Sequence, residues 1–372
     1  MKINQASIII IAFALVMTIC PIYSNSSKSQ RNSCISPDGK AVDWFIIYTL
    51  PRSATEQIDK FTYMDNTSED FKLYNAIPDE FPPIKIALEL NKTKEKSSKS
   101  KTSYVIWNDD ATNGDYKPTY NESFAHSKGL LSFDSKQGVY IIHSLPRFPF
   151  RDENNIVLNK FSSNFGIFGQ TFFCMSIDFS EVIHVLDVLL SIRPQILMHD
   201  ISEIHEKNPL IHNKIEKLVE MQKNVQTNDV FKIKTIGGLE VKIFVENKHG
   251  FLPWDFAIPE FYEDSFFVET WTRPSLLPNV CAGDKNVMNM LRIEKLGYSF
   301  YNTDDHSKWG VSVNKDIVCY GDLNRTNRPN LNNDRLGSVA CFEHSKVSKQ
   351  VKNFVKDYER CEKKDTMKFL YN

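Results

Sequence analysis

Apolar runs of strand length, each bounded by proline or polar residues, recur through the first half of the chain. AVDWFIIYTLP (41–51) is rich in aromatic and β-branched residues and ends at a proline, which predicts a buried strand. YVIWND (104–109) predicts another strand, and LLSFD (130–134) with GVYIIHSLPRFP (138–149) predicts a hairpin. In FSEVIHVLDVLLSIRPQI (179–196) the apolar residues follow a helical period, so we expect a helix that ends at the proline.

The second half repeats this order of strands and helices. LEVKIFVEN (239–247) predicts a strand, KNVMNMLRIEKL (285–296) a helix, and SKWGVSVN (307–314) with DIVCYGDLNR (316–325) a strand pair. The lysine-rich segment HSKVSKQVKNFVKDYERC (344–361) predicts a closing helix. Strands with intervening helices in each half predict an α/β or α+β protein whose two halves, each a mixed β-sheet flanked by helices, face each other.

The N-terminal segment has the composition of a secretory signal. Lys2 precedes the apolar run IIIIAFALVMTIC (8–20), which is too short to span a bilayer comfortably, and small and polar residues follow it. We therefore expect a signal peptide at residues 1–24, a first half at 25–200 and a second half at 201–372. Since no later segment is long and apolar enough for a membrane helix, we expect a soluble protein outside the cytosol.

Cysteines and glycosylation sequons agree with export. Of seven cysteines, Cys20 lies in the expected signal, and the six that remain predict three disulfides, whose pairing the sequence alone leaves open. Sequons predict N-glycans at Asn66, Asn91 and Asn121. Asn91 begins NKTKEKSSKSKTS (91–103), a charged, serine-rich stretch that predicts a surface loop.

The formal net charge is -1 at pH 7, which argues against a strongly cationic nucleic-acid binder at neutrality. Acid changes this balance, because protonating all nine histidines brings the positive charges to 54 against at most 46 negative ones. A polyanion would therefore be attracted better below roughly pH 6.

One tripeptide recurs in matching surroundings. FAHSKGLLSFD (124–134) and DHSKWGVSVN (305–314) each contain His-Ser-Lys, then an apolar alternation, then Asp134 or Asn314 eight positions after the histidine. A third copy at His344 lacks this context, and we assign it to an exposed basic helix. The matched copies favour an internal duplication.

Histidine and lysine two residues apart on a strand project to the same face. A neutral imidazole can attack phosphorus, an imidazolium can protonate a leaving oxygen, and lysine supplies a fixed charge for phosphate oxygens. Two such sites, His126 with Lys128 and His306 with Lys308, brought face to face would form a complete phosphodiesterase that requires no metal. Because one imidazole must be charged while the other is neutral, this design predicts an acid optimum.

Plainer interpretations compete with each motif. A single His-x-Lys is usually part of a solvated strand or loop, and it is the matched pair that favours chemistry. A metal site at His199, His205 and His212 is disfavoured, because only the last two share a helical face and a proline lies between them; a solvated pair of helices is expected instead.

The chain resembles the deoxyribonuclease II family, the acid, metal-independent DNases, over nearly its whole mature length. The resemblance rests on VDWFIIYTLP, VIWND, AHSKGLL, IIHSLPRFP, GQTFFCMS, TIGGLEVKIFVEN, DDHSKWGVS and VCYGDLNR followed by ACF, in the family's order. It implies a phospholipase D-like fold of two pseudo-symmetric halves with the active site at their interface. It also implies DNA as substrate, no cofactor, and a lysosomal or secreted destination.

By this resemblance His126, Lys128, His306 and Lys308 are the catalytic residues. One histidine would attack phosphorus to give a phosphohistidine and the other would protonate the 5′-oxygen, leaving 3′-phosphate and 5′-hydroxyl ends; which histidine does which stays open. The resemblance further implies the disulfides Cys34–Cys174, Cys281–Cys361 and Cys319–Cys341.

Further residues are candidates for supporting or substrate-binding roles. Asp134 and Asn314 could orient a strand or an imidazole, or could equally cap turns. Asp305 could raise the basicity of His306 or end the preceding loop, and His143 could be an interior histidine. Because a glycan at Asn324 would obstruct the cleft, we predict that its sequon is unused. The supporting candidates are Asp134, His143, Asn314, Asp322, Asn324 and Trp309, the last as a stacking partner for a base.

Two other functions share this fold. One is a secreted protein that binds DNA or a host molecule with weak or no turnover, which the intact histidine and lysine pairs disfavour. The other is hydrolysis of lipid head groups, which no membrane-docking segment supports. The sequence leaves open whether the protein is a monomer or a homodimer.

Overall fold

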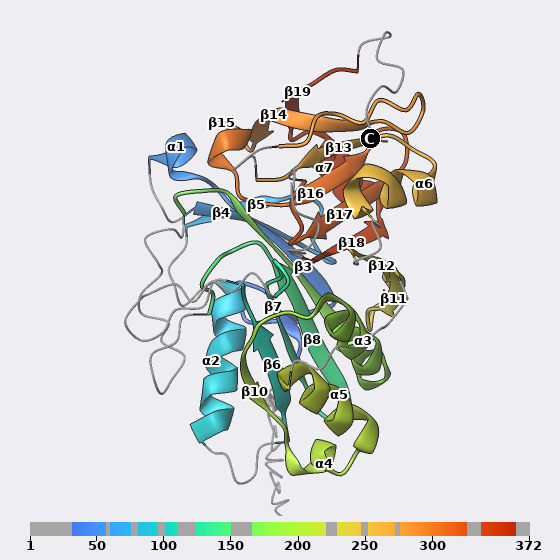
Figure 1. The fold of residues 1–372 in the computed structure, drawn as a ribbon. Helices are drawn as coiled ribbons and strands as arrows, with labels where there is room; N and C mark the ends of the chain where they lie inside the picture. Colours follow the sequence, from blue (N-terminus) through green and yellow to red (C-terminus); the bar gives the residue numbers. More distant parts are fainter. Residues whose placement is uncertain are drawn as a thin grey trace, which may run out of the picture. The chain divides into compact units, whose positions relative to one another are not determined.

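A computed structural model describes ten stretches of the chain, which together form one compact unit beginning after residue 30. The described residues are 32–56, 60–75, 81–95, 101–109, 124–149, 166–220, 229–246, 252–271, 276–325 and 336–361. The expected signal peptide at 1–24 and the sequon at Asn121 lie outside them, as does the side chain of Asn91. The described part is a mixed α/β structure with two large sheets (Figure 1).

The first sheet has eight strands, and every neighbouring pair in it is antiparallel. Their order across the sheet is β10-β6-β7-β8-β9-β3-β4-β5. A separate two-stranded ribbon, β1 (Cys34–Ile35) with β2 (Ala41–Val42), precedes them. The strands are β3 (Trp44–Thr49), β4 (Lys60–Asp65), β5 (Lys72–Asn75), β6 (Ser103–Trp107), β7 (Gly129–Phe133), β8 (Gln137–His143), β9 (Gln170–Asp178) and β10 (Ile196–Asp200).

The second sheet has the order β11-β12-β18-β17-β16-β13-β14-β15, with β19 added on β14. Only β13 and β14 pair in parallel. The strands are β11 (Val230–Lys234), β12 (Glu240–Val245), β13 (Phe266–Glu269), β14 (Val287–Lys295), β15 (Tyr298–Tyr301), β16 (Trp309–Ser312), β17 (Ile317–Gly321), β18 (Ser338–Glu343) and β19 (Val355–Tyr358).

Five neighbouring strands of one sheet match five of the other. β6-β7-β8-β9-β3 corresponds to β13-β16-β17-β18-β12, and in both sets the first four strands follow one another in chain order. The register agrees as well, because Trp107 pairs with Gly129 where Glu269 pairs with Trp309. Each His-Ser-Lys motif thus ends at the residue before the second strand of its set, as an internal duplication would place it.

The inner faces of the two sheets share one core. Phe173 on β9 stacks on Phe342 of β18, with ring centroids 5.0 Å apart. The ring centroid of Tyr320 on β17 lies 6.0 Å from that of Phe173. Alternate strand residues point into this core because side chains on a strand alternate between faces. Burial of these apolar side chains is the main interaction that holds the two sheets together.

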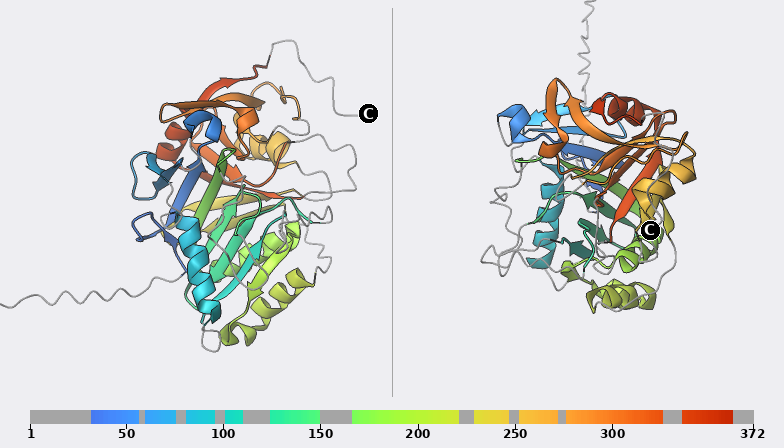
Figure 2. Two further views of the ribbon diagram at one scale, coloured as in Figure 1. Left: turned by 90° about the vertical axis from the view of Figure 1, so that its left-hand side faces the viewer. Right: turned by 45° about the horizontal axis from the view of Figure 1, so that its top comes forward.

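Helices pack on both faces of the first sheet. α2 (Pro82–Glu95) packs on the outer face of the first sheet, whereas α3 (Val182–Ile192) and α5 (Pro209–Val219) join the inner core, so β6, β7 and β8 lie between them (Figures 1 and 2). The side chain of Asn208 caps α5 by accepting from two backbone amides. The remaining α-helices are α1 (Arg52–Thr55), α4 (Glu203–Glu206), α6 (Ile258–Tyr262) and α7 (Ser345–Lys352), and Pro253–Ala257 forms a π-helix. Two short 3₁₀ helices lie at Phe179–Glu181 and Asn302–Asp304.

Three expectations about elements were wrong. The segment 285–296 is not a helix but the long strand β14, which bonds to β13, β15 and β19. The closing lysine-rich helix stops at Lys352, and its last part forms β19. The expected loop at 91–103 begins inside α2, which continues to Glu95. In the first two segments the helical and strand patterns are close, and partners distant in sequence decide.

The six cysteines after Cys20 form three disulfides, Cys34–Cys174, Cys281–Cys361 and Cys319–Cys341, the pairing that the resemblance implies. Cys319 and Cys341 are direct partners on β17 and β18. None of the helices in the described ranges is long and apolar enough to cross a membrane. The proposed division near residue 200 stays a prediction; β10 ends at Asp200 in the first sheet, and α5, beyond it, packs on α3.

Candidate active site

The two matched His-Ser-Lys motifs lie at equivalent ends of β7 and β16. The backbone amide of His126 donates to the carbonyl of Leu336 at 2.7 Å, and that of His306 donates to the carbonyl of Gly169 at 2.8 Å. Gly169 precedes β9 and Leu336 lies two residues before β18, so each motif is anchored by the segment that leads into the fourth strand of the other half's set.

The imidazole rings are braced in the same crossed manner. Nδ1 of His126 lies 2.8 Å from the carbonyl oxygen of Asp322, which follows β17. Nδ1 of His306 lies 3.2 Å from the carbonyl oxygen of Ser144, which follows β8. Because a carbonyl oxygen only accepts, the contact at His126 favours the hydrogen on Nδ1 and leaves Nε2 for proton transfer or attack. Nδ1 of His306 has the same kind of acceptor beside it, but Nζ of Lys308 also lies 3.2 Å from it. Each half therefore orients the other half's histidine.

The lysines lie beside their histidines. Nζ of Lys128 is 3.5 Å from Nε2 of His126, and Nζ of Lys308 is 3.2 Å from Nδ1 of His306 and donates to the carbonyl of the same residue. Both lysines are buried, with 1% and 0% of their surface exposed. Each motif thus places a buried lysine side chain next to an imidazole, a pair of groups suited to a phosphate anion.

Asp109 is a member of the site that the sequence analysis missed. Its carboxylate contacts Nζ of Lys128 at 2.6 Å and Nε2 of His126 at 3.4 Å. The signal for it was the acid two residues beyond the strand in VIWND, but only the pairing of β6 with β7 brings that acid to the motif.

Trp271 is the second missed residue. Its ring lies 4.8 Å from the ring of His306 at 58°, and the ring of Phe168 lies edge-on to it, also at 4.8 Å. In the matched registers Trp271 stands two residues past Glu269, as Asp109 stands two past Trp107. The two half-sites are therefore alike in backbone and different in the side chain next to each histidine.

Burial controls the charges in this centre. It holds the pKa of His306 well below its usual range, and the charges of Lys308 and Lys128 act in the same direction. Burial also lowers the pKa of Lys308, with Lys128 adding to the effect. The field of one half thus acts on the ionisable groups of the other, as expected when both motifs share one low-dielectric site.

Two buried acids lie behind the motifs. Burial raises the pKa of Asp322 to about 6, although hydrogen bonds from the Ser127 hydroxyl (2.5 Å) and the Ser338 amide (2.7 Å) favour its carboxylate. Burial raises the pKa of Glu269 well above its usual range, and the charge of Asp305 adds to this. The charge of Lys308 acts in the opposite direction on the pKa of Glu269.

Several predicted supporting residues lie elsewhere. Asp134 accepts hydrogen bonds from the amides of Lys136 and Gln137 in the β7–β8 turn, and Asn314 bonds to Asp264 in the β16–β17 turn, so both belong to turns at the far ends of their strands. Trp309 was wrongly predicted to stack on a base. It is 1% exposed and lies in the inner core, since it alternates with Lys308 across the strand.

Other predicted residues divide between the site and the interior. Asp322 lies in the site, and Asn324, two residues further on, is half-buried. His143 is an interior histidine between Phe172 and Phe148 on the outer side of the first sheet. Asp305 accepts from Tyr48 and from Ser307, so it organises the loop rather than the ring of His306.

The histidines expected to lie on a solvated pair of helices, and the third His-Ser-Lys copy, are placed differently from the prediction. His205 was expected to be solvated, but it is buried, with Nδ1 2.6 Å from the hydroxyl of Ser103, and it packs between Phe133 and Phe179. His344 caps the start of α7 instead of lying within a helix. Among the described residues, no group of three or more His, Cys, Asp or Glu side chains is arranged to hold a metal ion.

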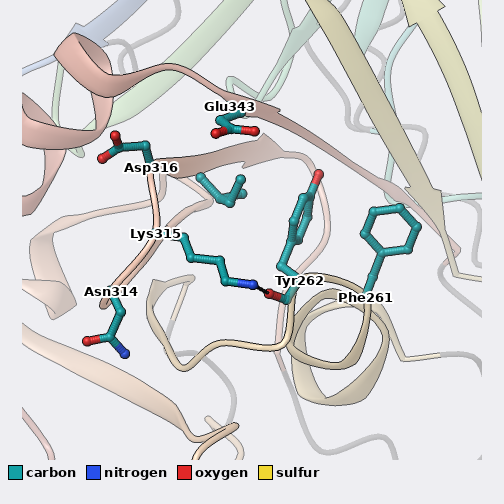
Figure 3. A pocket seen from close by; sticks show the side chains of 7 residues that line it. Phe261, Tyr262, Asn314, Lys315, Asp316 and Glu343 are labelled. Atoms are coloured by element: carbon teal, nitrogen blue, oxygen red, sulfur yellow. Dashed lines mark hydrogen bonds between the residues drawn. The ribbon is translucent and has the colours of Figure 1, made fainter.

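A surface hollow near the β16–β17 turn is distinct from the paired motifs. Figure 3 shows Lys315 in it, reaching the backbone carbonyl of Tyr262 at 2.5 Å. It contains none of the four motif residues. Its lining is Phe261, Tyr262, Asn314, Lys315, Asp316, Ile317 and Glu343.

Comparisons with known proteins point to one family. The family model described as Deoxyribonuclease II matches residues 33–361. The chain is 28% identical to Deoxyribonuclease-2-beta of Rattus norvegicus, over 88% of this chain and 92% of that protein. It is 26% identical to Cell-death-related nuclease 7 of Caenorhabditis elegans, over 90% of each. It is 25% identical to Plancitoxin-1 of Acanthaster planci, over 96% of this chain and 99% of that protein.

Proposed function

Because this chain belongs to the deoxyribonuclease II family, we propose that it is an acid endodeoxyribonuclease that cuts DNA at its two His-Ser-Lys motifs. The observation that carries the proposal is the crossed bracing of His126 and His306 by the carbonyls of Asp322 and Ser144. Two oriented imidazoles with a buried lysine beside each provide what phosphodiester cleavage needs.

The reaction proceeds in two balanced steps. Nε2 of one histidine attacks phosphorus, the bond to the 5′-oxygen breaks, and the other histidine gives that oxygen a proton. The second histidine then takes a proton from water, and the resulting hydroxide displaces the first histidine from phosphorus. The products are a 3′-phosphate and a 5′-hydroxyl, and both imidazoles return to their starting states.

Lys128 and Lys308 balance the charge that grows on the phosphoryl oxygens in both steps. Either histidine can serve as nucleophile in this scheme, which draws on no metal ion. One imidazole must be protonated and the other neutral, so activity should rise in acid and fall again where both are charged.

The same family assignment supports a proposal for the destination of the protein. Three disulfides fit an oxidising compartment. We propose that the N-terminal segment directs the chain into the secretory pathway, with a lysosome or the cell exterior as its site of action, and that Asn66 and Asn91 carry glycans there, as does Asn121.

Plasmid DNA incubated at about pH 5 with excess chelator tests the activity. The protein should nick and then linearise the plasmid, and the products should be substrates for a 3′-phosphatase. His126→Ala and His306→Ala should each lower the rate by at least about 10³-fold, because each removes a group required in both steps.

His344→Ala is the matched control, since it alters a third His-Ser-Lys copy that caps α7 away from the site. Its activity should stay near that of the wild-type protein. Retention of DNA without nicking would instead support a binding protein, and a strict need for divalent cations would contradict the proposed chemistry.

A further inference from the structure

Trp271 differs from the other four tryptophans of the chain. Trp44, Trp107, Trp254 and Trp309 are each 2% exposed or less and belong to the core clusters. Trp271 is half-buried. Partial exposure is ordinary for tryptophan; what distinguishes Trp271 is that its ring lies beside His306, in a site proposed to bind DNA.

Two contacts fix the position of Trp271: one holds its backbone and one holds its ring. β13 ends one residue before Thr270, whose hydroxyl accepts from the backbone amide of Arg325 at 3.2 Å. The ring of Phe168 lies 4.8 Å from the indole at 73°, an edge-on arrangement that aromatic pairs prefer. Phe168 is itself half-buried and precedes Gly169, which bonds to the backbone of His306.

The fold itself does not demand an aromatic residue at this point. The matched position in the first half is Asp109, a small carboxylate that pairs with Lys128. An indole placed on one side alone of a pseudo-symmetric centre makes the two approaches to the phosphate chemically different.

A nucleotide offers a phosphate and, beside it, a flat base. The buried lysines and histidines suit the phosphate, and an indole stacks on any base because every base has a π-face. We propose that Trp271, braced by Phe168, forms a subsite for the nucleobase next to the scissile phosphate on the His306 side. This inference rests on the proposed function and adds to it a contact with the base, in a single strand or a locally opened duplex.

Trp271 could alternatively act only by packing against the ring of His306. In that role it would be a positioning residue, and its loss would lower the rate equally on every substrate. A base subsite instead predicts that the effect of Trp271→Ala depends on whether a base is present, so a pair of substrates separates the two roles.

The substrates are short single-stranded oligonucleotides with one phosphodiester among uncharged methylphosphonate linkages. One has bases throughout, and two others carry a tetrahydrofuran abasic residue on the 5′ or the 3′ side of the cleavable bond. We expect the wild-type protein to lose about 5- to 150-fold in kcat/KM when the stacked base is missing, and little when the other base is missing.

Trp271→Ala should lose a similar factor in kcat/KM on the substrate that has bases throughout. The variant should no longer distinguish this substrate from the one that lacks the stacked base. Trp271→Phe should recover part of the discrimination. Phe261→Ala is the control, because Phe261 is 50% exposed on α6 and lies outside the site; it should discriminate as the wild type does.

The subsite is overturned if Trp271→Ala keeps the wild-type discrimination, or if it loses the same factor on all three substrates. Binding of fully methylphosphonate-blocked versions, measured by fluorescence anisotropy, separates this outcome from failure of the proposed function. If the wild-type protein cleaves nothing, the nuclease proposal fails. A Kd that depends on the base in the wild type but not in Trp271→Ala would still support the subsite. A Kd that does not depend on the base in the wild type rejects it.

Discussion

The imidazole of His143 lies between the rings of Phe172 at 5.1 Å and Phe148 at 5.4 Å. Burial lowers its pKa from the ordinary 6.5 to about 3, and the charge of Lys128 adds to this. Below pH 6.5 the unfolded chain therefore binds a proton at this residue that the folded protein does not bind. The stability linked to His143 is complete above pH 6.5 and is lost as the pH falls toward 3.

His143→Gln should remove this sensitivity. Between pH 7 and pH 5 the wild-type protein should lose about 2 kcal/mol of unfolding free energy through His143, and the variant should lose correspondingly less. Urea unfolding at the two pH values measures the difference. An equal loss in both proteins would show that the pKa of His143 is not lowered in the folded state.

Asp322 has the opposite dependence on pH. Burial raises its pKa from the ordinary 3.8 to about 6, so the folded protein binds the proton more tightly than the unfolded chain does. Its contribution to stability is complete below about pH 4 and is lost as the pH rises through 6. A protein proposed to work in acid thus has one buried acid whose protonation near pH 5 stabilises the fold of the site.

Asp322→Asn should abolish that gain. From pH 7 to pH 5 the wild-type protein should gain about 1 kcal/mol through Asp322, and the variant should not. Thermal unfolding at both pH values in the same buffer series measures it. A variant that still gains the full amount on acidification would exclude Asp322 as the source.

At the scale of single elements, alternation along short strands was the most informative sequence signal. It correctly predicted β3, β6, the β7–β8 hairpin, β12 and the β16–β17 pair. It failed for β14, where NVMNMLRIEK mixes apolar and polar residues in a pattern that suits either a helix or a strand. Pairing with β13, β15 and β19 decides the outcome there, and no local pattern contains those long-range partners.

The disulfides connect elements over different lengths of chain. Cys34–Cys174 closes a separation of 140 residues, and Cys319–Cys341 one of 22. If the main effect is on the entropy of the unfolded chain, the longer loop stabilises more.

Replacing both Cys34 and Cys174 by alanine should cost about 5 kcal/mol of unfolding free energy. Replacing both Cys319 and Cys341 by alanine should cost about 3 kcal/mol. Urea denaturation of the two double variants, with the wild-type protein beside them, gives the order. A larger loss from the shorter loop would show that local geometry on β17 and β18 outweighs loop entropy.

At the scale of the whole molecule, the sequence was sufficient to single out the two His-Ser-Lys motifs as candidates, but not to identify the residues around them. His126 and His306 could be found because the same tripeptide recurs with the same spacing. Asp109 and Trp271 could not, since their equivalence exists only in the registers of β6 with β7 and β13 with β16. The crossed carbonyls of Asp322 and Ser144 likewise arise from docking the halves, which no stretch of sequence records.

Docking of the halves through one core has a consequence for unfolding. Phe173 of the first sheet stacks on Phe342 of the second, and both belong to the shared inner cluster. Phe173→Ala should therefore lower the stability of both sheets together, by about 3 to 5 kcal/mol, because the cavity lies between them. Urea unfolding should remain one transition, with tryptophan fluorescence and acid plasmid cleavage lost at the same, lower midpoint.

Phe261→Ala, at a half-exposed position on α6, should shift that midpoint by no more than about 0.5 kcal/mol. If Phe173→Ala instead splits the curve into two transitions of which only one moves, the sheets fold independently. Each histidine would then lose its brace when either half opens, because the bracing carbonyl comes from the other half. Activity should therefore follow the less stable of the two transitions.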